Sequence, residues 1–308
     1  MADQPIHYSL SELIAPAEEP VTTAEATSWM NVNTSADDTT IGSMITAARQ
    51  QAEIFTRRRF VASMLRMSLD RFPTGNNPIF LRSPPLLYLK QIQYIDTNGT
   101  TQVWGDVAME IRVTPATVEV GDVFDIIAAG VTIATFTATD ATVANVTAGL
   151  ETTWNASTSD YATYVTATDQ TTYLELLGDT GQGFAVTTST TDGGGADTQT
   201  LVAVEQNDES TVYTVDATSI LPRIEPARTT VTLTGQDYPD TNPDINAVLI
   251  DYVAGYGAAS AVPEITKAAI KFLVADMYEH RESQSEISLQ DNQTVKDMLW
   301  SLRVPTAA

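Results

Sequence analysis

The residues that most resemble a catalytic signature are Asp179, Thr180 and Gly181, because Asp-Thr-Gly is the sequence around the active-site aspartate of aspartic proteases. That chemistry needs two such carboxylates sharing one proton. A symmetric dimer could supply the second carboxylate, but the residues around Asp179 are those of a polar turn rather than a buried loop. We therefore interpret Asp179–Gly181 as a β-turn and predict that the chain is not an enzyme.

Other residues that could bind a ligand also have simpler structural interpretations. Gly193–Gly195 lacks the Lys-Ser/Thr pair that follows the glycines of a phosphate-binding loop, so a linker is predicted there. Asp37 and Asp38 could bind a cation, but two carboxylates are also favourable at the start of a helix. The chain has no cysteine and only two histidines, which argues against a thiolate or zinc site. We predict no cofactor and no metal.

The charge of the chain is strongly acidic and unevenly distributed. There are 39 Asp and Glu residues against 16 Lys and Arg, and the net charge is −23. No basic residue lies between Arg112 and Arg223, whereas 15 carboxylates do. Such a chain is not expected to bind DNA tightly by neutralising phosphates, although DNA could slide past it without sticking. Solubility through like-charge repulsion is the alternative reason for the acidic excess.

Neither a signal peptide nor a membrane span is expected. The first ten residues, MADQPIHYSL, lack the basic segment and apolar core of a signal peptide. No run of about 18 apolar residues occurs anywhere in the chain. We therefore expect a soluble protein that is made in a cytoplasm and has no membrane partner.

The dense basic cluster of the chain is Arg57–Arg59, at the end of a helix predicted over residues 37–59. The apolar residues from Ile41 to Phe55 recur there with the 3.6-residue period of one helical face. Positive charges suit the negative C-terminal end of a helix. The arginines could instead pair with acidic residues of a neighbouring subunit, or contact DNA. Arg57, Arg58 and Arg59 are therefore a candidate intersubunit contact.

A second candidate contact lies near the C-terminus. Val295, Met298, Leu299 and Leu302 have the spacing of one face of a last helix, and Trp300 lies just off this stripe. Trp300 would be partly exposed in a monomer, whereas a docking contact would bury it. Aromatic residues and arginine are enriched where proteins dock. The candidate docking residues are Met298, Leu299, Trp300, Leu302, Arg303 and Val304.

The first part of the chain, up to about residue 111, is predicted to pass from helices to strands. Residues 1–20 are expected to form an irregular arm, and Thr22 and Glu25 have the spacing of a capping box at the start of a short helix. Residues 61–70 alternate in polarity, which predicts a half-buried strand. Asp96–Gly99 is a hairpin signal because Asn-Gly tolerates positive φ. Further strands are expected in this part at residues 79–81, 88–96, 101–104 and 109–113. Later in the chain, strands are expected at residues 210–216, 228–235 and 247–255.

The composition changes abruptly between residues 113 and 209, where 23 positions are threonine. Threonine is β-branched and favours strands, and strands are predicted at residues 117–127, 132–138, 161–167, 173–177 and 184–190. Val143, Val146, Leu150 and Trp154 have helical spacing, which predicts one helix packed on the sheet. Gly193–Gly195 is expected to be the flexible exit of this segment.

The end of the chain returns to helices. A helix is expected to begin at Val262-Pro263, because proline is tolerated in the first turn. Its predicted apolar face is Ile265, Ala268, Ala269, Phe272, Leu273 and Met277. A polar spacer, SQSEISLQDNQ, should separate it from the last helix.

These elements together predict an α+β fold. N- and C-terminal helices would form a discontinuous bundle, a central antiparallel β module would project from it, and a Thr-rich, acidic, β-rich domain would be inserted into the β module. The predicted division is residues 1–111 and 210–308 for the core and 112–209 for the inserted domain.

Several short motifs occur in a specific order. They are EPVTTAEA, E-x-x-T-R-R-R from Glu53 to Arg59, RFP, LRSPPL, DTNG, and then, after the insert, YTVD, LPRI, VLIDYVAGYG, VPE and YEHRE. In this order the chain resembles the gp6-like head–tail connector proteins of tailed bacteriophages, also called head-completion or adaptor proteins. The resemblance covers roughly residues 18–111 and 210–303. The acidic insert departs from the family pattern and resembles small β modules of other phage structural proteins.

The resemblance implies a structural role in a virion. Members of the family form a ring of about twelve subunits beneath the portal protein, and the genomic DNA passes through the ring. One face docks on the portal, often through the C-terminal segment, and the other meets the tail or a stopper or terminator protein. The six C-terminal docking candidates are then portal-docking candidates. The alternative is a tail or capsid decoration protein whose β insert binds a partner or a cell surface.

Overall fold

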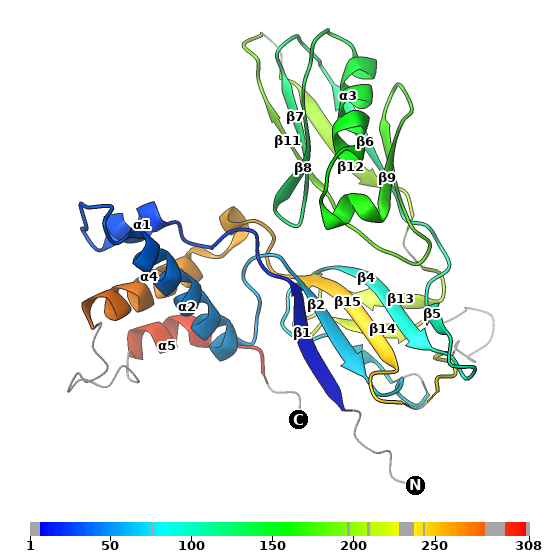
Figure 1. Cartoon of the computed structure of the whole chain (residues 1–308), viewed down its shortest axis with the longest axis horizontal. Helices are drawn as coiled ribbons and strands as arrows, with labels where there is room; N and C mark the ends of the chain where they lie inside the picture. Colours follow the sequence, from blue (N-terminus) through cyan, green and yellow to red (C-terminus); the bar gives the residue numbers. More distant parts are fainter. Residues whose placement is uncertain are drawn as a thin grey trace.

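The computed structural model describes residues 7–75, 77–195, 198–207, 210–227, 237–242, 244–280 and 293–305. Its helices and antiparallel sheets confirm the predicted α+β class. Helices α1, α2, α4 and α5 lie together on one side, the β module lies beside them, and the segment that carries helix α3 stands above the β module (Figure 1). The strand predicted over residues 228–235 and the polar spacer after α4 lie largely outside the described residues.

The elements follow one another with short connections. The helices are α1 Thr23–Trp29, α2 Asp38–Thr56, α3 Val143–Asn155, α4 Glu264–Glu279 and α5 Gln293–Trp300. The strands are β1 Tyr8–Ile14, β2 Ser63–Leu69, β3 Ile79–Phe80, β4 Leu86–Ile95, β5 Thr101–Val103, β6 Glu110–Ala116, β7 Val123–Ala128, β8 Val131–Thr137, β9 Val165–Asp169, β10 Leu174–Gly178, β11 Thr187–Thr191, β12 Thr200–Glu205, β13 Tyr213–Asp216, β14 Arg223–Pro226 and β15 Val248–Ala254.

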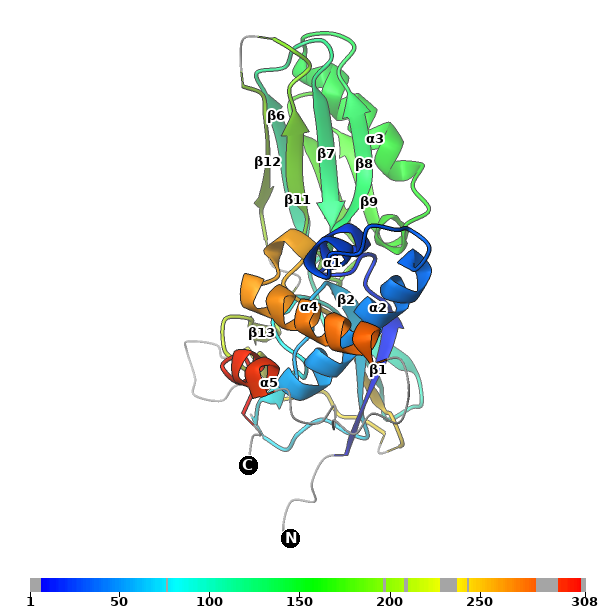
Figure 2. The ribbon, with the colours of Figure 1, turned by 90° about the vertical axis from the view of Figure 1, so that its left-hand side faces the viewer.

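The helical bundle is closed by segments from both ends of the chain. Helix α2 packs against α4 and α5, which follow it by some two hundred residues, and α4 crosses the bundle in front of α2 (Figure 2). The capping box of α1 is present, with Thr22 and Glu25 each bonding the backbone of the other. The predicted apolar face of α4 was partly wrong. Its buried side chains are Thr266, Lys267, Ala269, Ile270 and Val274, and Ile265 is exposed.

Two sheets form the β module. The larger sheet has the strand order β1-β2-β15-β4-β5, and the smaller has the order β13-β14-β3. Strand β1 corrects the prediction of an irregular N-terminal arm, because Tyr8–Ile14 pairs antiparallel with β2, Tyr8 opposite Leu69. The β4–β5 hairpin at Asp96–Gly99 is confirmed, with Gly99 at a φ of +80°.

Strand β2 of the larger sheet is buried on both faces, whereas the sequence predicted a half-buried strand over residues 61–70. Leu65 and Met67 of β2 face the smaller sheet and an aromatic cluster around Trp104. Met64, on the opposite face, packs into the core of the inserted segment. The alternation in β2 is real, but a second layer covers the face expected to meet solvent, so every residue of β2 except Arg66 is buried.

The inserted segment has two sheets and one helix. Its sheets have the orders β12-β6-β10-β9 and β11-β7-β8. Helix α3 is confirmed, and Trp154 is fully buried and donates its indole N–H to the carbonyl of Val165 at 2.9 Å. Residues 109–113 do not return to the hairpin as predicted, because β6 joins this segment instead. Gly193–Gly195 is not the exit either, since β12 follows it and pairs with β6 inside the inserted segment.

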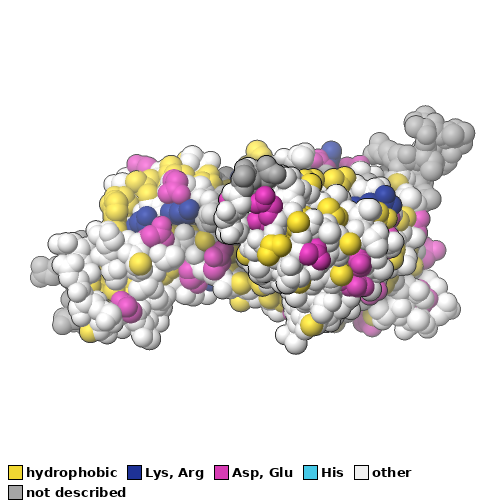
Figure 3. Space-filling model, turned by 90° about the horizontal axis from the view of Figure 1, so that it is seen from above, with side chains coloured by type: hydrophobic (Ala, Val, Ile, Leu, Met, Phe, Trp, Pro, Cys, Tyr) yellow, Lys and Arg dark blue, Asp and Glu magenta, His cyan; other side chains and the backbone are white. Residues whose placement is uncertain are grey.

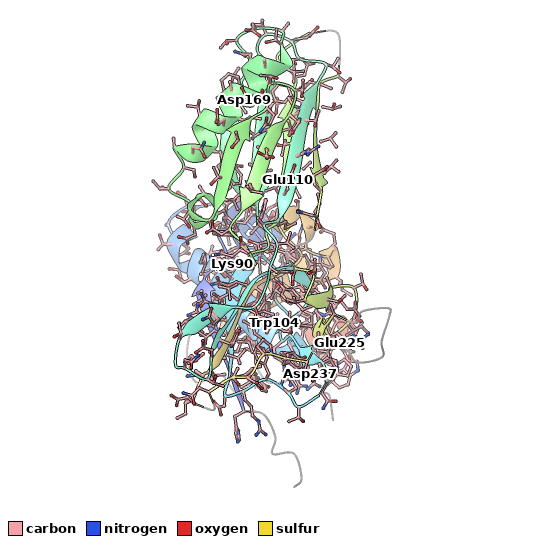
Figure 4. The ribbon with its side chains drawn as sticks, turned by 90° about the vertical axis from the view of Figure 1, so that its right-hand side faces the viewer. Lys90, Trp104, Glu110, Asp169, Glu225 and Asp237 are labelled. Atoms are coloured by element: carbon pink, nitrogen blue, oxygen red, sulfur yellow. The ribbon has the colours of Figure 1, made fainter. Side chains whose placement is uncertain are left out.

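The inserted segment is seated on the larger sheet by specific contacts. The N–H of Gly183 donates to the carbonyl of Lys90 at 2.7 Å. The ammonium of Lys90 lies 4.2 Å from the ring centre of Tyr164, and the hydroxyls of Tyr164 and Tyr88 are 3.5 Å apart. Figure 4 shows Lys90 where the two parts meet, between Glu110 above and Trp104 below. The two parts therefore share one packed interface rather than a bare linker.

Two helical glycines give opposite predictions for substitution by alanine. A Cβ on Gly149 of α3 would lie 2.2 Å from ring carbons of Phe136, so Gly149→Ala should lower the free energy of unfolding, since overpacking costs about 1–3 kcal/mol. A Cβ on Gly42 of α2 would meet nothing within 4 Å outside its own helix. Gly42→Ala should therefore raise stability by about 0.5–1 kcal/mol. Denaturant unfolding of both variants followed by circular dichroism measures the contrast, and a stabilised Gly149→Ala would contradict it.

Candidate functional site

The three consecutive arginines lie beyond the end of α2 rather than in its last turn. The helix ends at Thr56, not at Arg59 as predicted, and Arg57 adopts the left-handed conformation with a φ of 58°. The N–H groups of Arg57 and Arg58 both bond the carbonyl of Glu53. The chain then turns toward β2. The arginines therefore point in different directions and have different surroundings.

Arg59 belongs to an ion-pair network inside the chain. It contacts Glu12 of β1 at 3.0 Å and Glu53 of α2 at 2.9 Å. The same Glu53 oxygen accepts from Arg49 at 3.0 Å, and Arg49 also pairs with Glu19 at 2.7 Å. The network thus joins the N-terminal segment, β1 and α2, with each arginine between two carboxylates.

The network compensates charges that are removed from water. Arg49 and Glu53 are 5% and 4% exposed. Burial by itself lowers the pKa of Arg49, but its hydrogen bond to Glu19 and the negative charges of Glu53, Glu19 and Glu12 outweigh burial, so the pKa is raised. The other Glu53 oxygen accepts the N–H of Phe60 at 3.0 Å, which completes the partners of this carboxylate. Buried ions are tolerated when they are paired and hydrogen-bonded in this way.

The six C-terminal docking candidates differ in how far their side chains are exposed to a partner. Leu299 and Val304 are buried in the chain itself, each 3% exposed. Met298 and Leu302 are half-buried. Trp300 is 62% exposed, and the guanidinium of Arg303 lies over its ring and over that of Phe55. Only Trp300 and Arg303 of these residues present much surface to a partner. Their docking role stays a prediction.

The structure brings the two predicted contacts together although they are far apart in sequence. The guanidinium Nε of Arg58 donates to the carbonyl of Leu302 at 2.5 Å, and the N–H of Val304 donates to the carbonyl of Thr56 at 2.9 Å. A cavity of about 750 Å³, which we call the arginine cavity, lies between the arginines, the C-terminal residues and strand β1. It is lined by Tyr8, Leu10, Glu12, Gln50, Glu53, Ile54, Arg57, Arg58, Arg59, Arg82, Ser83, Pro84, Leu221, Val304 and Pro305.

Sequence reasoning missed two parts of this cavity. The β1 residues were read as an irregular arm, although Tyr8, Ser9, Leu10 and Ser11 alternate in polarity as a strand does. Arg82 was noted only as part of the motif LRSPPL, with no role of its own. In the structure its guanidinium lies 4.7 Å from the ring centre of Tyr8. Nothing local in the sequence indicates that contact.

The other sequence candidates have structural roles. Gln182 donates its N–H to the carbonyl of Asp179 at 3.0 Å, which closes a turn as predicted. Asp37 accepts the hydroxyl of Tyr278 at 2.7 Å and so links α2 to α4. Among the described residues, Glu119, Asp122 and Asp192 lie close enough to share an ion, but Asp122 already accepts the N–H groups of Glu119 and Gly193.

The chain carries many more acidic than basic side chains, 39 against 16. Seen from above, Asp and Glu side chains are scattered over the face, while Lys and Arg appear in a few separate places (Figure 3). Four of the 16 basic residues line the arginine cavity, which makes it an unusual concentration of positive charge. No helix within the described residues is long and apolar enough to cross a membrane.

The fold is similar to that of chains in gene transfer agent particles. The sequence matches no protein-family model, and a search of curated proteins gives no match. Among solved structures, a chain of "Virion of native gene transfer agent (GTA) particle" is 14% identical, with a TM-score of 0.52 and 97% of each chain covered. A chain of "Neck of empty GTA particle computed with C6 symmetry" is 14% identical, with a TM-score of 0.50 and the same coverage. At 97% coverage the shared fold extends over the inserted segment.

Proposed function

We propose that this chain is a structural protein of a phage-like virion and acts as a head–tail adaptor. Copies would form a ring beneath the portal protein and continue the DNA channel from the capsid to the tail. The observation that carries the proposal is the fold shared over 97% of the chain with a chain of a gene transfer agent neck. The order of motifs that resembles the gp6-like connector family supports the same role independently.

The proposed partners follow from this position. They are neighbouring copies, the portal, and a tail, stopper or terminator protein. The similar neck structure was computed with C6 symmetry, and the family resemblance implies about twelve subunits, so a closed symmetric ring is the expected assembly. We also propose the domain division at residues 112–209, with the chain made in the host cytoplasm and then incorporated into the virion neck.

Two surfaces are proposed to make these contacts. Arg57 and Arg58 would meet acidic groups of a neighbouring copy, because each copy has a large acidic excess. Arg59 is a poorer contact residue, since Glu12 and Glu53 already pair with it. Trp300 with Arg303 would dock on the portal. The mechanism is mechanical: these contacts would seal the joint, and acidic channel walls would keep DNA mobile.

Electron microscopy tests the proposal directly. The purified chain, alone and mixed with the portal protein of its own particle, should give ring-shaped particles with a central pore in negative stain. Images of the particle neck should then show this fold below the portal. Decoration of the capsid or tail surface, without a ring, would support the alternative of a decoration protein and reject the adaptor.

The acidic excess predicts weak interaction with DNA. With a net charge of −23, the chain should not shift a short DNA duplex in a gel at physiological salt, because it releases few counterions from phosphates. The measurement is a mobility-shift titration, with a basic DNA-binding protein as positive control. Tight binding that weakens steeply with added salt would show that DNA is held rather than allowed to slide.

A further inference from the structure

Strand β1 leaves one side of the larger sheet open. It is the first strand in the order β1-β2-β15-β4-β5, so among the described residues no strand pairs with its outer edge. Tyr8, Leu10 and Leu13 are 50%, 37% and 43% exposed, and β1 contains neither proline nor lysine. Proteins commonly guard such an edge, because its unpaired N–H and carbonyl groups are a template for another strand.

The arginine cavity lies on a defined face of this edge strand. Tyr8, Leu10 and Glu12 alternate along β1 and all line the cavity. Residues opposite one another in a sheet point to the same face. A strand added to the outer edge of β1 would therefore place every second side chain beside these three residues, above the cavity.

The arginine cavity favours acidic side chains at these alternate positions of the added strand. Arg58 gives its Nε to a neutral backbone carbonyl, and Arg82 lies over the ring of Tyr8. The Nε of Arg82 is buried, and the described residues offer it no hydrogen-bond acceptor. Guanidinium groups bind carboxylates in a bidentate, charge-assisted manner. Ile54, 79% exposed at the same cavity, offers an apolar contact between the charges.

We propose that the outer edge of β1 and the arginine cavity receive an extended acidic segment of a partner protein. The segment adds a strand to the sheet, and its alternate carboxylates bind Arg58 and Arg82. Main-chain hydrogen bonds supply affinity and the arginines supply specificity, as in other strand-addition complexes. In this arrangement Arg58 binds the partner segment and Arg57 is left for the neighbouring copy, so peptide binding tests this inference and ring images test the neck proposal.

A labelled peptide in which Glu alternates with Val is the probe, with a Lys-for-Glu peptide beside it. Fluorescence anisotropy with the full chain should show saturable binding of the Glu peptide, weakened by salt, and none of the Lys peptide. Arg58→Gln with Arg82→Gln should weaken binding about 30-fold or more, because desolvated charge pairs are lost. The matched control is Arg223→Gln, an exposed arginine outside the cavity, which should leave binding unchanged.

Backbone pairing is tested with the same peptide methylated on alternate nitrogens. Methylation of the backbone nitrogens whose N–H groups point toward β1 should abolish binding. Methylation of the nitrogens that point away from β1 should not. Arg82→Gln alone serves if the double variant does not keep the circular dichroism spectrum of the parent. Absent binding, equal binding of the Lys peptide, or equal tolerance of both methylated sets would overturn the proposal. So would a dimer of this chain that occupies the edge and excludes the peptide.

Discussion

Replacing Glu53 by alanine is expected to lower the free energy of unfolding by about 3–5 kcal/mol, the range for breaking a buried ion pair by removing one partner. Glu53 is 4% exposed and pairs with both Arg49 and Arg59. Its loss leaves an empty space beside the buried Arg49, which then has only Glu19 as an ionic partner. It also removes the acceptor of the Phe60 N–H, at the point where α2 turns toward β2. Urea unfolding followed by circular dichroism measures the change.

Two further variants separate charge from general damage to a helix. Glu264→Ala removes a largely exposed carboxylate at the start of α4, whose partner Lys267 is mostly buried, and it should cost less than Glu53→Ala because Glu264 itself remains in contact with water. Glu53→Gln keeps an oxygen for the Phe60 N–H but loses the charge, so its stability should fall between that of the parent and that of Glu53→Ala. If Glu53→Ala unfolds no more easily than Glu264→Ala, the network is not a main support of the fold.

The sequence predicts elements whose pattern is local. Thr22 and Glu25, three residues apart, give the capping box, and the spacing of Val146, Leu150 and Trp154 gives α3. The Asn-Gly turn gives the β4–β5 hairpin. Each of these depends on residues that are close in the chain, so propensity and period are sufficient evidence.

The arrangement of layers was not predictable in the same way. The alternation in β2 indicates two faces, but it cannot show that the inserted segment covers the polar one. Met64, which packs into the core of that segment, and Arg66, which pairs with Asp251 at 2.7 Å, depend on residues far along the chain. Strand β1 was missed for a related reason, because both its faces are largely exposed and give little hydrophobic signal.

The candidate site was predicted in its parts but not in its organisation. Arg57–Arg59 and the residues from Met298 to Val304 were chosen separately, and the structure places Val304 beside the three arginines in the lining of one cavity and bonds the carbonyl of Leu302 to Arg58. We predicted one common role for the three arginines because they are adjacent in the chain. Their backbone, with Arg57 in the left-handed conformation, directs Arg59 into the ion-pair network instead. Pairing with Glu12 depends on a strand that had not been recognised.

Reversal of charge at the arginines should therefore separate assembly from folding. Arg57→Glu with Arg58→Glu is expected to leave a folded monomer that forms no rings, because carboxylates then face the acidic groups of the next copy. Desolvated charge pairs between proteins are worth about 2–5 kcal/mol, enough to prevent assembly when reversed. Loss of the Arg58 bond to the Leu302 carbonyl should cost only about 1 kcal/mol of stability. Arg59→Glu should instead destabilise the monomer itself, since it places a third carboxylate against Glu12 and Glu53.

The measurements are sedimentation and negative-stain images for assembly, and thermal unfolding for the monomer. A charge-matched control reverses Arg223 and Lys271, which lie outside the arginine cavity, and rings should persist in it because the net charge changes equally without touching the cavity. If rings still form with Arg57→Glu and Arg58→Glu, these two residues do not form the subunit contact. Rings lost equally in the control would mean that net charge, and not this surface, governs assembly. A triple reversal that includes Arg59 cannot distinguish these cases, because the ion-pair network would break and the monomer would unfold before assembly could be judged.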